Sequence, residues 1–202
     1  MQAIRVLSQA DPKLRRLIMQ AGPFTLSPRR RSPFEALVSA VAYQQLHAKA
    51  AETILGRFKA LYRPRRFPRP EDIVATSIPK LRGCGFSRAK VAAIRDIAAH
   101  TLSGVVPTLR HADALSDAEI IDRLTAIRGV GVWTVEMFLM FTLGRMDVLP
   151  ATDYGVRQGF AITYGWKALP TPKQLLAHGE CWRPYRSVAS WYMWRAVDGT
   201  AK

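Results

Sequence analysis

The chain has 202 residues, with 30 lysines and arginines against 15 aspartates and glutamates and a formal net charge of +15 at pH 7. This length suffices for one sizeable domain or two small lobes with a buried core, so a disulfide or metal scaffold is unnecessary. The positive charge argues against an enzyme of small neutral ligands and favours a polyanionic partner, nucleic acid first and an anionic membrane as the weaker alternative.

Several other classes of protein are disfavoured by the sequence. Cys84 and Cys181 lie far apart without a C-x-x-C partner, so we expect buried thiols and neither a zinc nor an iron–sulfur site. The longest apolar run, VWTVEMFLMFTLG, is thirteen residues long and contains Glu136, which indicates a core helix and not a membrane span. No apolar secretory segment opens the chain. We therefore expect a soluble cytoplasmic protein, associated with the nucleoid in a bacterium or archaeon and nuclear in a eukaryote.

Helix signals recur from end to end, with proline and glycine between them and no run of alternating β-branched residues. We predict an all-α protein of about ten helices. The stretch DPKLRRLIMQAG opens with an Asp cap followed by proline and closes on Gly22. In the next helix SPFE is a capping box, and an apolar stripe follows. The stripe comprises Phe34, Leu37, Val38 and Val41.

The apolar stripe breaks at Gln44 and Gln45, where one more turn of helix would place apolar side chains. Either the helix stops there, or two amides protrude for a purpose. The stretch AKAAETILGRFKALY predicts the next helix at once. Its expected buried residues are Ala51, Ile54, Leu55, Phe58 and Leu61.

The rest of the chain, from residue 63 on, continues the helical pattern. A basic, proline-rich link, RPRRFPRP, leads into EDIVAT and then into IPKLRGCGFSRAKVAAIRDIAAH, two helices joined at glycines. SDAEIIDRLTAI and TPKQLLAHG each begin with a capping box, made by Ser116 with Glu119 and by Thr171 with Gln174. PYRSVASWYMWRAV predicts the last helix.

A glycine turn in LTAIRGVGVWTV joins one helix ending near Ile127 to another beginning near Gly131. Gly129 and Gly131 permit a tight hairpin and a close approach of a ligand to main-chain N–H groups. Those groups lie at a helix N-terminus, which favours an anion, and the net charge points to a DNA phosphate. The simpler alternative is a helix–helix turn without a ligand.

The succession LTAIRGVGVWTVEMFLMFTLGRMDVLPATDYGVRQGF resembles the helix–hairpin–helix, Gly-Pro-Asp segment of the DNA glycosylase superfamily. Three further stretches agree in order: FEALVSAVAYQQLHAKAAETILGRF, FPRPEDI with LRGCGFSRAKVAAIRDIA, and CWRPYRSVASWYMW. Together they span about residues 33 to 197 and are similar to the alkylated-base branch, the 3-methyladenine DNA glycosylase II type. The resemblance implies two lobes with the active site in the cleft between them, and a helix–hairpin–helix at about 117–143. We expect 1–202 to form a single glycosylase domain without the N-terminal β domain of larger members.

Asp153 is the candidate catalytic residue. Breaking an N-glycosidic bond develops positive charge on the sugar, which a fixed carboxylate stabilises while it orients the attacking water. Asp153 follows Pro150 at an expected helix start, beside the potential cap Thr152. Arg157, one turn on, is expected to pair with it or with a DNA phosphate. The alternative is an ordinary acid at a helix N-terminus.

The resemblance also assigns a base pocket and a reaction class. Bifunctional relatives carry a lysine where this chain has Trp133, so the resemblance implies a monofunctional enzyme that hydrolyses with water. Trp133 and Trp194, with Tyr43 as a weaker third, are the candidates to stack on a flipped cationic base, where a cation–π contact contributes about 0.5–2 kcal/mol. Trp182, Trp191 and Tyr192 are expected in the core.

DNA contacts are implied around QQLH and the hairpin. Gln45 is the candidate that fills the gap left by the flipped base, Leu46 is the alternative wedge, and His47 is either a groove or phosphate contact or a surface histidine. Lys90 matches a position where the family often has lysine, although a solvated charge explains it equally well. The expected contacts at the hairpin are Gly129, Val130, Gly131 and Thr134. The family further implies a monovalent cation, Na⁺ or K⁺, on the main-chain carbonyls of Thr125, Ile127 and Val130.

These expectations combine into one function. The resemblance implies a monomeric, monofunctional glycosylase without organic cofactor or membrane partner, which excises 3-methyladenine or 7-methylguanine type bases from duplex DNA. One alternative keeps the fold and changes the substrate to a deaminated, oxidised or ethenoadduct base. Another is a helix–hairpin–helix module that binds DNA without catalysis.

Overall fold

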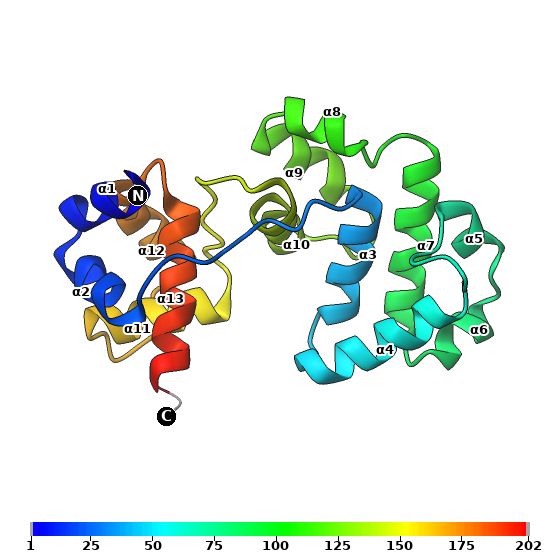
Figure 1. Ribbon diagram of the computed structural model, residues 1–202, viewed down its shortest axis with the longest axis horizontal. Coiled ribbons are helices and arrows are strands. Elements are labelled where there is room, and N and C mark those ends of the chain that lie inside the picture. Colours follow the sequence, from blue (N-terminus) through cyan, green and yellow to red (C-terminus); the bar gives the residue numbers. More distant parts are fainter. Residues whose placement is uncertain (1, 201–202) are drawn as a thin grey trace. The chain divides into compact units, whose positions relative to one another are not determined.

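The computed structural model describes residues 2–200, and within them every regular element is a helix (Figure 1). The predicted all-α class is confirmed, with thirteen α-helices in the described residues where about ten were expected. The chain divides into two compact units, unit 1 with residues 1–28 and 139–202 and unit 2 with residues 29–138. Each unit is built around its own set of buried apolar side chains.

Unit 1 contains both ends of the described chain. Its elements are α1 (Gln2–Ala10), α2 (Pro12–Ala21), the π-helical turn η1 (Leu139–Leu143), α11 (Tyr154–Tyr164), α12 (Pro172–Gly179), the 3₁₀ turn η2 (Glu180–Trp182) and α13 (Arg186–Thr200). Trp182, Trp191 and Tyr192 are all buried, as expected for core residues. The opening stretch, for which the sequence indicated no helix before Asp11, is the amphipathic α1, and its Leu7 is fully buried.

α11 and α13 form the closest packing in unit 1. A Cβ placed on Gly159 would lie 1.9 Å from the carbonyl oxygen of Met193, so the two helix backbones touch at this glycine. Because nothing larger fits, the glycine fixes the separation of the two helices. The N-terminus of α11 is thereby held at a set position along α13.

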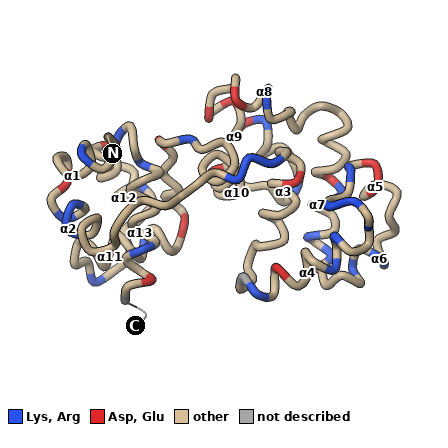
Figure 2. Tube along the Cα trace, in the orientation of Figure 1, with Lys and Arg blue, Asp and Glu red and all other residues tan. Residues whose placement is uncertain are grey.

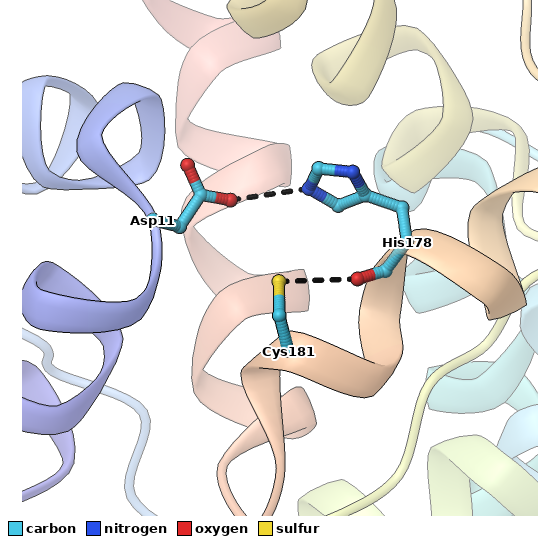
Figure 3. Close-up of side chains that lie close together, drawn as sticks. All are labelled: Asp11, His178 and Cys181. Carbon is cyan, nitrogen blue, oxygen red and sulfur yellow. Dashed lines mark hydrogen bonds and ion pairs between the residues drawn. The ribbon is translucent and has the colours of Figure 1, made fainter.

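Asp11 joins α2 to the C-terminal half of unit 1. Its Oδ1 caps α2 by accepting from Lys13 N and Leu14 N, both at 3.0 Å. Its Oδ2 accepts from His178 Nε2 at 3.1 Å (Figure 3). The same oxygen accepts from Trp182 Nε1 at 2.9 Å and from the Tyr164 hydroxyl. Burial raises the pKa of Asp11, but these donors lower it by more, so that the pKa lies well below its usual range. The carboxylate is thus ionised and fully hydrogen-bonded at neutral pH.

Cys181 lies beside the Asp11 cluster, and its Sγ donates to the carbonyl oxygen of His178 at 3.1 Å (Figure 3). Cys84 is buried as expected, but Cys181 is exposed, so the expectation of two buried thiols is wrong for the second. The 3₁₀ turn η2 brings Trp182, its neighbour, into the core instead.

Unit 2 comprises eight helices. They are α3 (Pro33–Tyr43), α4 (Ala48–Ala60), α5 (Pro70–Ala75), α6 (Ile78–Gly83), α7 (Arg88–Leu102), α8 (Leu109–Ala114), α9 (Asp117–Thr125) and α10 (Val132–Phe138). α3 is buried along most of its length and packs against α4, α7 and α10. Edge-to-face contacts join Phe58 to Phe67 and Phe86, and Phe34 to Phe67. The predicted stripe on α3 is buried throughout.

Helix boundaries follow local sequence signals closely. The capping boxes of Ser116 with Glu119 and of Thr171 with Gln174 are both formed, and Ser32 accepts from Glu35 N at 3.1 Å. The apolar run at 132–144 differs from expectation, because α10 gives way after Phe138 to the π-helical turn η1. The helix α8 has no periodic apolar pattern and was not predicted.

Basic residues are distributed over the helices of both units, and acidic residues are fewer (Figure 2). In the described part of the chain, no helix combines the length and the apolar character that crossing a membrane requires.

Candidate active site

Asp153 is the N-cap of α11. Its Oδ1 accepts from Val156 N at 2.8 Å and from Trp194 Nε1 at 2.9 Å. The cap is therefore Asp153 itself and not its neighbour Thr152, which the sequence had offered as the potential cap. Two N–H donors therefore hold this carboxyl group at the N-terminus of α11, where the positive end of the helix dipole lies. The side chain is only partly buried, so solvent and ligands can reach it.

Trp194 reaches Asp153 from the middle of α13. Its indole is partly buried and stacks on Phe141 of η1, with ring centroids 5.7 Å apart and an interplanar angle of 26°. A Cβ on Gly155 would lie 2.8 Å from Trp194 Cδ1 and 3.2 Å from its Nε1, so only glycine leaves room for the indole here. The sequence predicted Trp194 as a stacking residue. The structure adds its hydrogen bond to the candidate catalytic carboxylate.

Gly155 and Gly159 are functional residues that sequence reasoning missed. They stand one helical turn apart and both meet α13, at Trp194 and at Met193. The signal that could have found them is the Gly-x-x-x-Gly spacing in YGVRQGF, which marks a helix face that approaches another backbone closely. Together they let α11 present Asp153 to the indole of α13.

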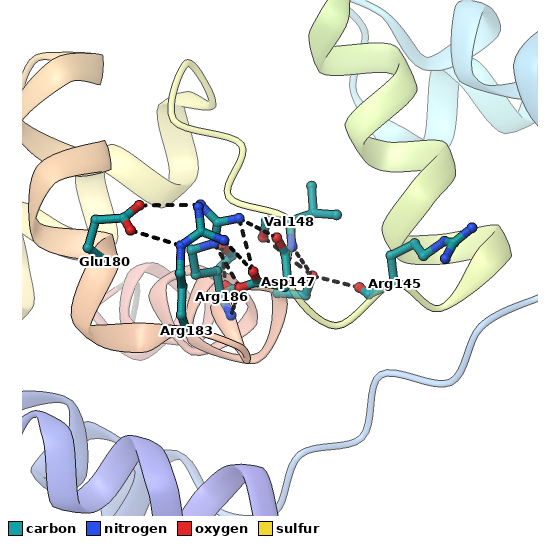
Figure 4. A network of polar contacts seen from close by, with 8 residues as sticks. Arg145, Asp147, Val148, Glu180, Arg183 and Arg186 are labelled. Carbon is teal, nitrogen blue, oxygen red and sulfur yellow. Dashed lines mark hydrogen bonds and ion pairs between the residues drawn. The ribbon is translucent and has the colours of Figure 1, made fainter. Parts of the chain in front are cut away.

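The segment that leads from η1 to Asp153 is held by an ionic cluster at the start of α13 (Figure 4). Asp147 accepts from Arg183 Nη1 at 2.6 Å, from Arg186 Nε at 2.8 Å and from Arg186 Nη2 at 3.1 Å. Arg186 Nη2 also donates to the Asp147 carbonyl oxygen at 2.7 Å, and Glu180 accepts from Arg183 Nε at 2.8 Å. A two-pronged contact of this kind fixes orientation as well as distance.

Ser187, buried at 1% exposure, completes the anchor of this segment. Its hydroxyl donates to the Arg145 carbonyl at 2.7 Å and accepts from Val148 N at 2.9 Å, while its own N–H donates to the Met146 carbonyl at 3.0 Å. The motif WRPYRS, residues 182–187, thus holds residues 145–148, which precede Asp153, through hydrogen bonds and ion pairs. The sequence showed the motif as part of a resemblance, but only the contacts reveal what it does.

Arg157 lies on α11 and is partly buried. Its Nε donates to the carbonyl oxygen of Pro170 at 2.7 Å, so the side chain is anchored within unit 1. One of its five N–H donors is therefore engaged in fixing the loop that precedes α12. A phosphate contact through the other nitrogens stays a prediction.

The hairpin between α9 and α10 lies in unit 2. Gly129 has φ of +79°, and a Cβ there would lie 2.6 Å from Ala93 Cβ on α7. Arg128 N donates to Asp96 Oδ2 at 2.7 Å, which ties the turn to α7 a second time. Gly131 has neither a positive φ nor any atom within 4 Å of a Cβ. The hairpin therefore requires glycine at Gly129 and not at Gly131, where the close approach of a ligand stays a prediction.

Two residues expected to contact DNA at the hairpin point inward. Thr134 is 2% exposed, and its hydroxyl accepts from Gln44 Nε2 at 3.1 Å. Val130 is 3% exposed, and its N–H donates to the Ile127 carbonyl at 3.1 Å. Both residues are therefore engaged inside unit 2, and their contact with DNA stays a prediction. The exposed positions of the turn are Arg128, Gly129, Gly131 and Val132.

The break in the apolar stripe of α3 has a definite structure. The helix ends at Tyr43, and Gln44 Nε2 donates to the Gly129 carbonyl at 3.0 Å as well as to Thr134. Gln45 has φ of +54°, and within the described residues no other residue except glycine has a positive φ. Such a conformation costs roughly 1–2 kcal/mol for a residue with a Cβ and is found most often at functional sites. One amide is therefore tied to the hairpin, and the other is exposed.

Leu46 and His47 follow Gln45 on the surface of unit 2. Leu46 is 39% exposed, which is unusual for leucine, and His47 is exposed at the N-cap of α4 without a side-chain capping bond. All three side chains of the turn are thus available to a partner. The structure places them beside the hairpin, because Gln44 bonds directly to it.

The predicted base-pocket residues are distributed over both units. Trp133, partly buried, is the second residue of α10, and Tyr43, 37% exposed, is the last residue of α3, which packs against α10. Trp194 belongs to unit 1 with Asp153. Each unit therefore holds one compact set of predicted residues.

The carbonyls predicted to hold a monovalent cation belong to the hairpin. The Ile127 carbonyl accepts Val130 N–H at 3.1 Å, which leaves its second lone pair for a ligand. Thr125 is the last residue of α9, where the final carbonyls of a helix lack intrahelical partners. The donor chemistry of the turn fits such an ion, which stays a prediction.

Comparison with known proteins places the chain among well-defined relatives. A family model described as HhH-GPD superfamily base excision DNA repair protein matches residues 38–184. DNA-3-methyladenine glycosylase 1 of Schizosaccharomyces pombe is 42% identical over 191 residues, covering 94% of this chain and 84% of that protein. The alkylbase DNA glycosidase-like protein mag2 of the same organism is 32% identical, covering 96% and 92%.

Solved structures agree with these sequence relationships. The structure of S. pombe 3-methyladenine DNA glycosylase Mag1 in complex with abasic DNA matches with a TM-score of 0.90 and 41% identity, over 96% of this chain and 95% of that chain. A DNA-3-methyladenine glycosidase from Bacillus halodurans matches with a TM-score of 0.84 and 38% identity, over 97% and 88%. The similarity extends over more than nine tenths of this chain.

Proposed function

Because the chain belongs to the HhH-GPD superfamily of base excision DNA repair proteins, we propose that it is a monofunctional DNA glycosylase that hydrolyses alkylated bases from duplex DNA. The bases are of the 3-methyladenine and 7-methylguanine type, and the product is an abasic site. The observation that carries the proposal is the pair of Asp153 and Trp194, a helix-capping carboxylate held by an indole N–H.

The carboxylate supplies electrostatic stabilisation. As the N-glycosidic bond breaks, the sugar becomes positively charged, and Asp153 offers a fixed negative charge to it. Val156 N and Trp194 Nε1 both bond to Oδ1 and hold the carboxyl group in one orientation. Pre-organisation of this kind avoids reorienting the group during the reaction. The same carboxylate is suited to orient the attacking water.

The absence of an amine determines the reaction class. Strand-cleaving relatives use a lysine at the position that Trp133 occupies here, and an indole cannot form a Schiff base with the sugar. Water is therefore the nucleophile, and the strand stays intact. Trp133, Trp194 and Tyr43 are proposed to line the base pocket, where aromatic faces favour an electron-poor, alkylated base.

Unit 2 is proposed to bind the DNA duplex. The exposed residues of the hairpin turn, Arg128, Gly129, Gly131 and Val132, contact phosphates. Gln45 or Leu46 fills the gap left by the flipped nucleotide, with His47 in the groove. We further propose a monovalent cation on the hairpin carbonyls, a monomeric protein, and residence in the compartment that holds DNA. The placement of the active site in a cleft between the lobes stays a prediction.

The experiment is a panel of duplexes that each carry one damaged base. Release of free base from 3-methyladenine or 7-methylguanine duplexes, with strand breaks only after alkali treatment, is the expected result. Faster base release from duplexes with a deaminated, oxidised or ethenoadduct base than from alkylated duplexes would make that base the substrate instead. Strand breaks without alkali would overturn the monofunctional assignment. Tight DNA binding without release from any duplex would identify a binding module.

A further inference from the structure

The C-terminus of α3 is closed by a lysine from another helix. Lys90, in the first turn of α7, donates its Nζ to the Gln44 carbonyl at 2.8 Å and to the Ala42 carbonyl at 3.0 Å. Its stem is partly buried, and burial lowers the pKa of the ammonium group. A cation at the negative end of a helix dipole satisfies carbonyls that the helix itself leaves without donors.

The hydrogen bonds at the C-terminus of α3 come from the following residues of the chain and from Lys90. Gln44 N donates to the carbonyls of Ala40 and Val41, and Leu46 N donates to the Tyr43 carbonyl at 3.3 Å. Lys90 donates to the carbonyls of Ala42 and Gln44, on either side of Tyr43 at the end of α3. A helix usually ends in this way on glycine in the left-handed conformation, but here the left-handed residue is Gln45. The turn therefore needs support from outside the helix.

That support continues to the hairpin. Gln44 receives the Lys90 ammonium on its main-chain carbonyl and donates its side-chain amide to the Gly129 carbonyl and the Thr134 hydroxyl. Gly129 in turn packs against Ala93, which lies one turn beyond Lys90 on α7. The contacts close a circuit from α7 through the turn to the hairpin and back to α7. All of these residues belong to unit 2.

We propose that Lys90 and Gln44 are positioning residues that lock the Gln45–His47 turn to the α9–α10 hairpin, so that the gap-filling side chain and the phosphate-binding turn engage damaged DNA as one rigid piece. The proposal rests on the proposed glycosylase function. Lys90 and Gln44 act through the turn and not on the reacting atoms. They set the affinity for DNA from which a base is missing or flipped out, more than the affinity for intact duplex.

The test compares two affinities in each variant. Lys90→Met removes the ammonium group and keeps a stem of similar length, and Gln44→Met removes the side-chain amide. Each is expected to weaken binding to a duplex with a tetrahydrofuran abasic analogue by about tenfold, in the range for residues that share one hydrogen-bond network. Binding to the undamaged duplex is expected to change by less than about threefold. The rate of single-turnover excision of 7-methylguanine is expected to fall together with the affinity for the abasic-analogue duplex.

A matched control separates lost contacts from lost charge. Lys80→Met makes the same substitution at an exposed lysine on α6 of the same unit. It is expected to lower both affinities equally and slightly, through the general phosphate attraction. Thermal unfolding of every variant fixes the temperature of the binding assays well below each transition, so that all measurements report folded protein.

A double-mutant cycle shows whether Lys90 acts through the turn. In a Gln45→Ala, Leu46→Ala background, adding Lys90→Met is expected to change abasic-duplex binding by less than about twofold, because no gap-filling side chain remains to be positioned. An undiminished tenfold loss in that background would overturn the proposal, and so would equal losses on damaged and undamaged duplexes. If the unsubstituted protein itself neither excises bases nor prefers the abasic duplex, the failure belongs to the proposed function instead.

Discussion

Replacing Asp153 with asparagine isolates the charge of the candidate catalytic group. The amide oxygen of asparagine can accept from Val156 N and Trp194 Nε1 in the geometry that the carboxylate oxygen has, at 2.8 and 2.9 Å. Asparagine is also as good an N-cap as aspartate, so α11 keeps its start. The folded structure is therefore expected to be retained, with a change in the free energy of unfolding of less than about 0.5 kcal/mol.

The expected loss of activity follows from Coulomb's law. A carboxylate about 4 Å from the developing positive charge stabilises it by about 4 kcal/mol at the effective dielectric constant of a partly exposed protein site. Asp153 is partly exposed, so this value is more suitable than that for a dry interior. At 1.36 kcal/mol for each factor of ten, Asp153→Asn is expected to slow base release by about a thousandfold.

The assay is single-turnover release of 7-methylguanine from a methylated duplex, together with affinity for an abasic-analogue duplex. The rate is expected to fall by about three orders of magnitude, while the affinity stays within about fivefold. A rate within tenfold of the unsubstituted protein would refute the reasoning, because the substitution removes the charge and keeps the helix cap and both hydrogen bonds. A matching fall in affinity would instead assign Asp153 to DNA binding.

The remaining predictions concern Trp194, the hairpin glycines and Asp11. Trp194→Phe retains an aromatic ring but removes the N–H donor to Asp153, and it is expected to lower single-turnover release by roughly 10- to 100-fold without loss of abasic-duplex affinity. Gly131→Leu is expected to fold normally, because a Cβ there has open space, and to weaken DNA binding with a smaller salt dependence. Gly129→Ala is expected to lower the free energy of unfolding by at least about 1 kcal/mol in denaturant titrations. Asp11→Ala removes the N-cap of α2 and leaves two buried donors, Leu14 N and Trp182 Nε1, without this acceptor. The free energy of unfolding is therefore expected to fall by about 3–5 kcal/mol. The pKa of Asp11 is depressed in the folded protein, so its contribution to stability is complete above about pH 5 and is lost as the pH falls below about 4. The free energy of unfolding measured against pH checks this. A stability that rose as the pH fell below about 4 would contradict it.

The hairpin illustrates how far residue patterns reach. The glycine turn of RGVGV, the helix that follows it and the superfamily were all predicted from spacing and resemblance, and the family model over residues 38–184 confirms the superfamily. Which glycine is obligatory was not predictable, because Gly129 owes its role to Ala93 on α7, 36 positions earlier in the chain. A sequence shows that glycine is present, but the atom that would collide with a Cβ comes from elsewhere in the fold.

Gln44 and Thr134 show the same limit from the side of polar residues. The break in the apolar stripe of α3 correctly marked the two glutamines as exceptional. Their different roles, one bonded to the hairpin and one exposed at φ of +54°, depend on a hydrogen bond across 90 positions of sequence. Thr134 is buried as a partner in the same contact, and its burial could not be read from the neighbouring sequence.

The sequence by itself determined the all-α class, the superfamily, the identity of Asp153 as the candidate acid, and the helix caps at Asp11, Ser32, Ser116 and Thr171. These depend on local backbone chemistry and on residues in a fixed order. Only the tertiary structure decided that Trp194 donates to Asp153, that Gly155 and Gly159 make room for that contact, and that the WRPYRS tail holds the segment before it. The physical reason is distance: hydrogen bonds and close packing operate over about 3–4 Å in space. In these three sets of contacts the partners are separated by up to 41 positions along the chain.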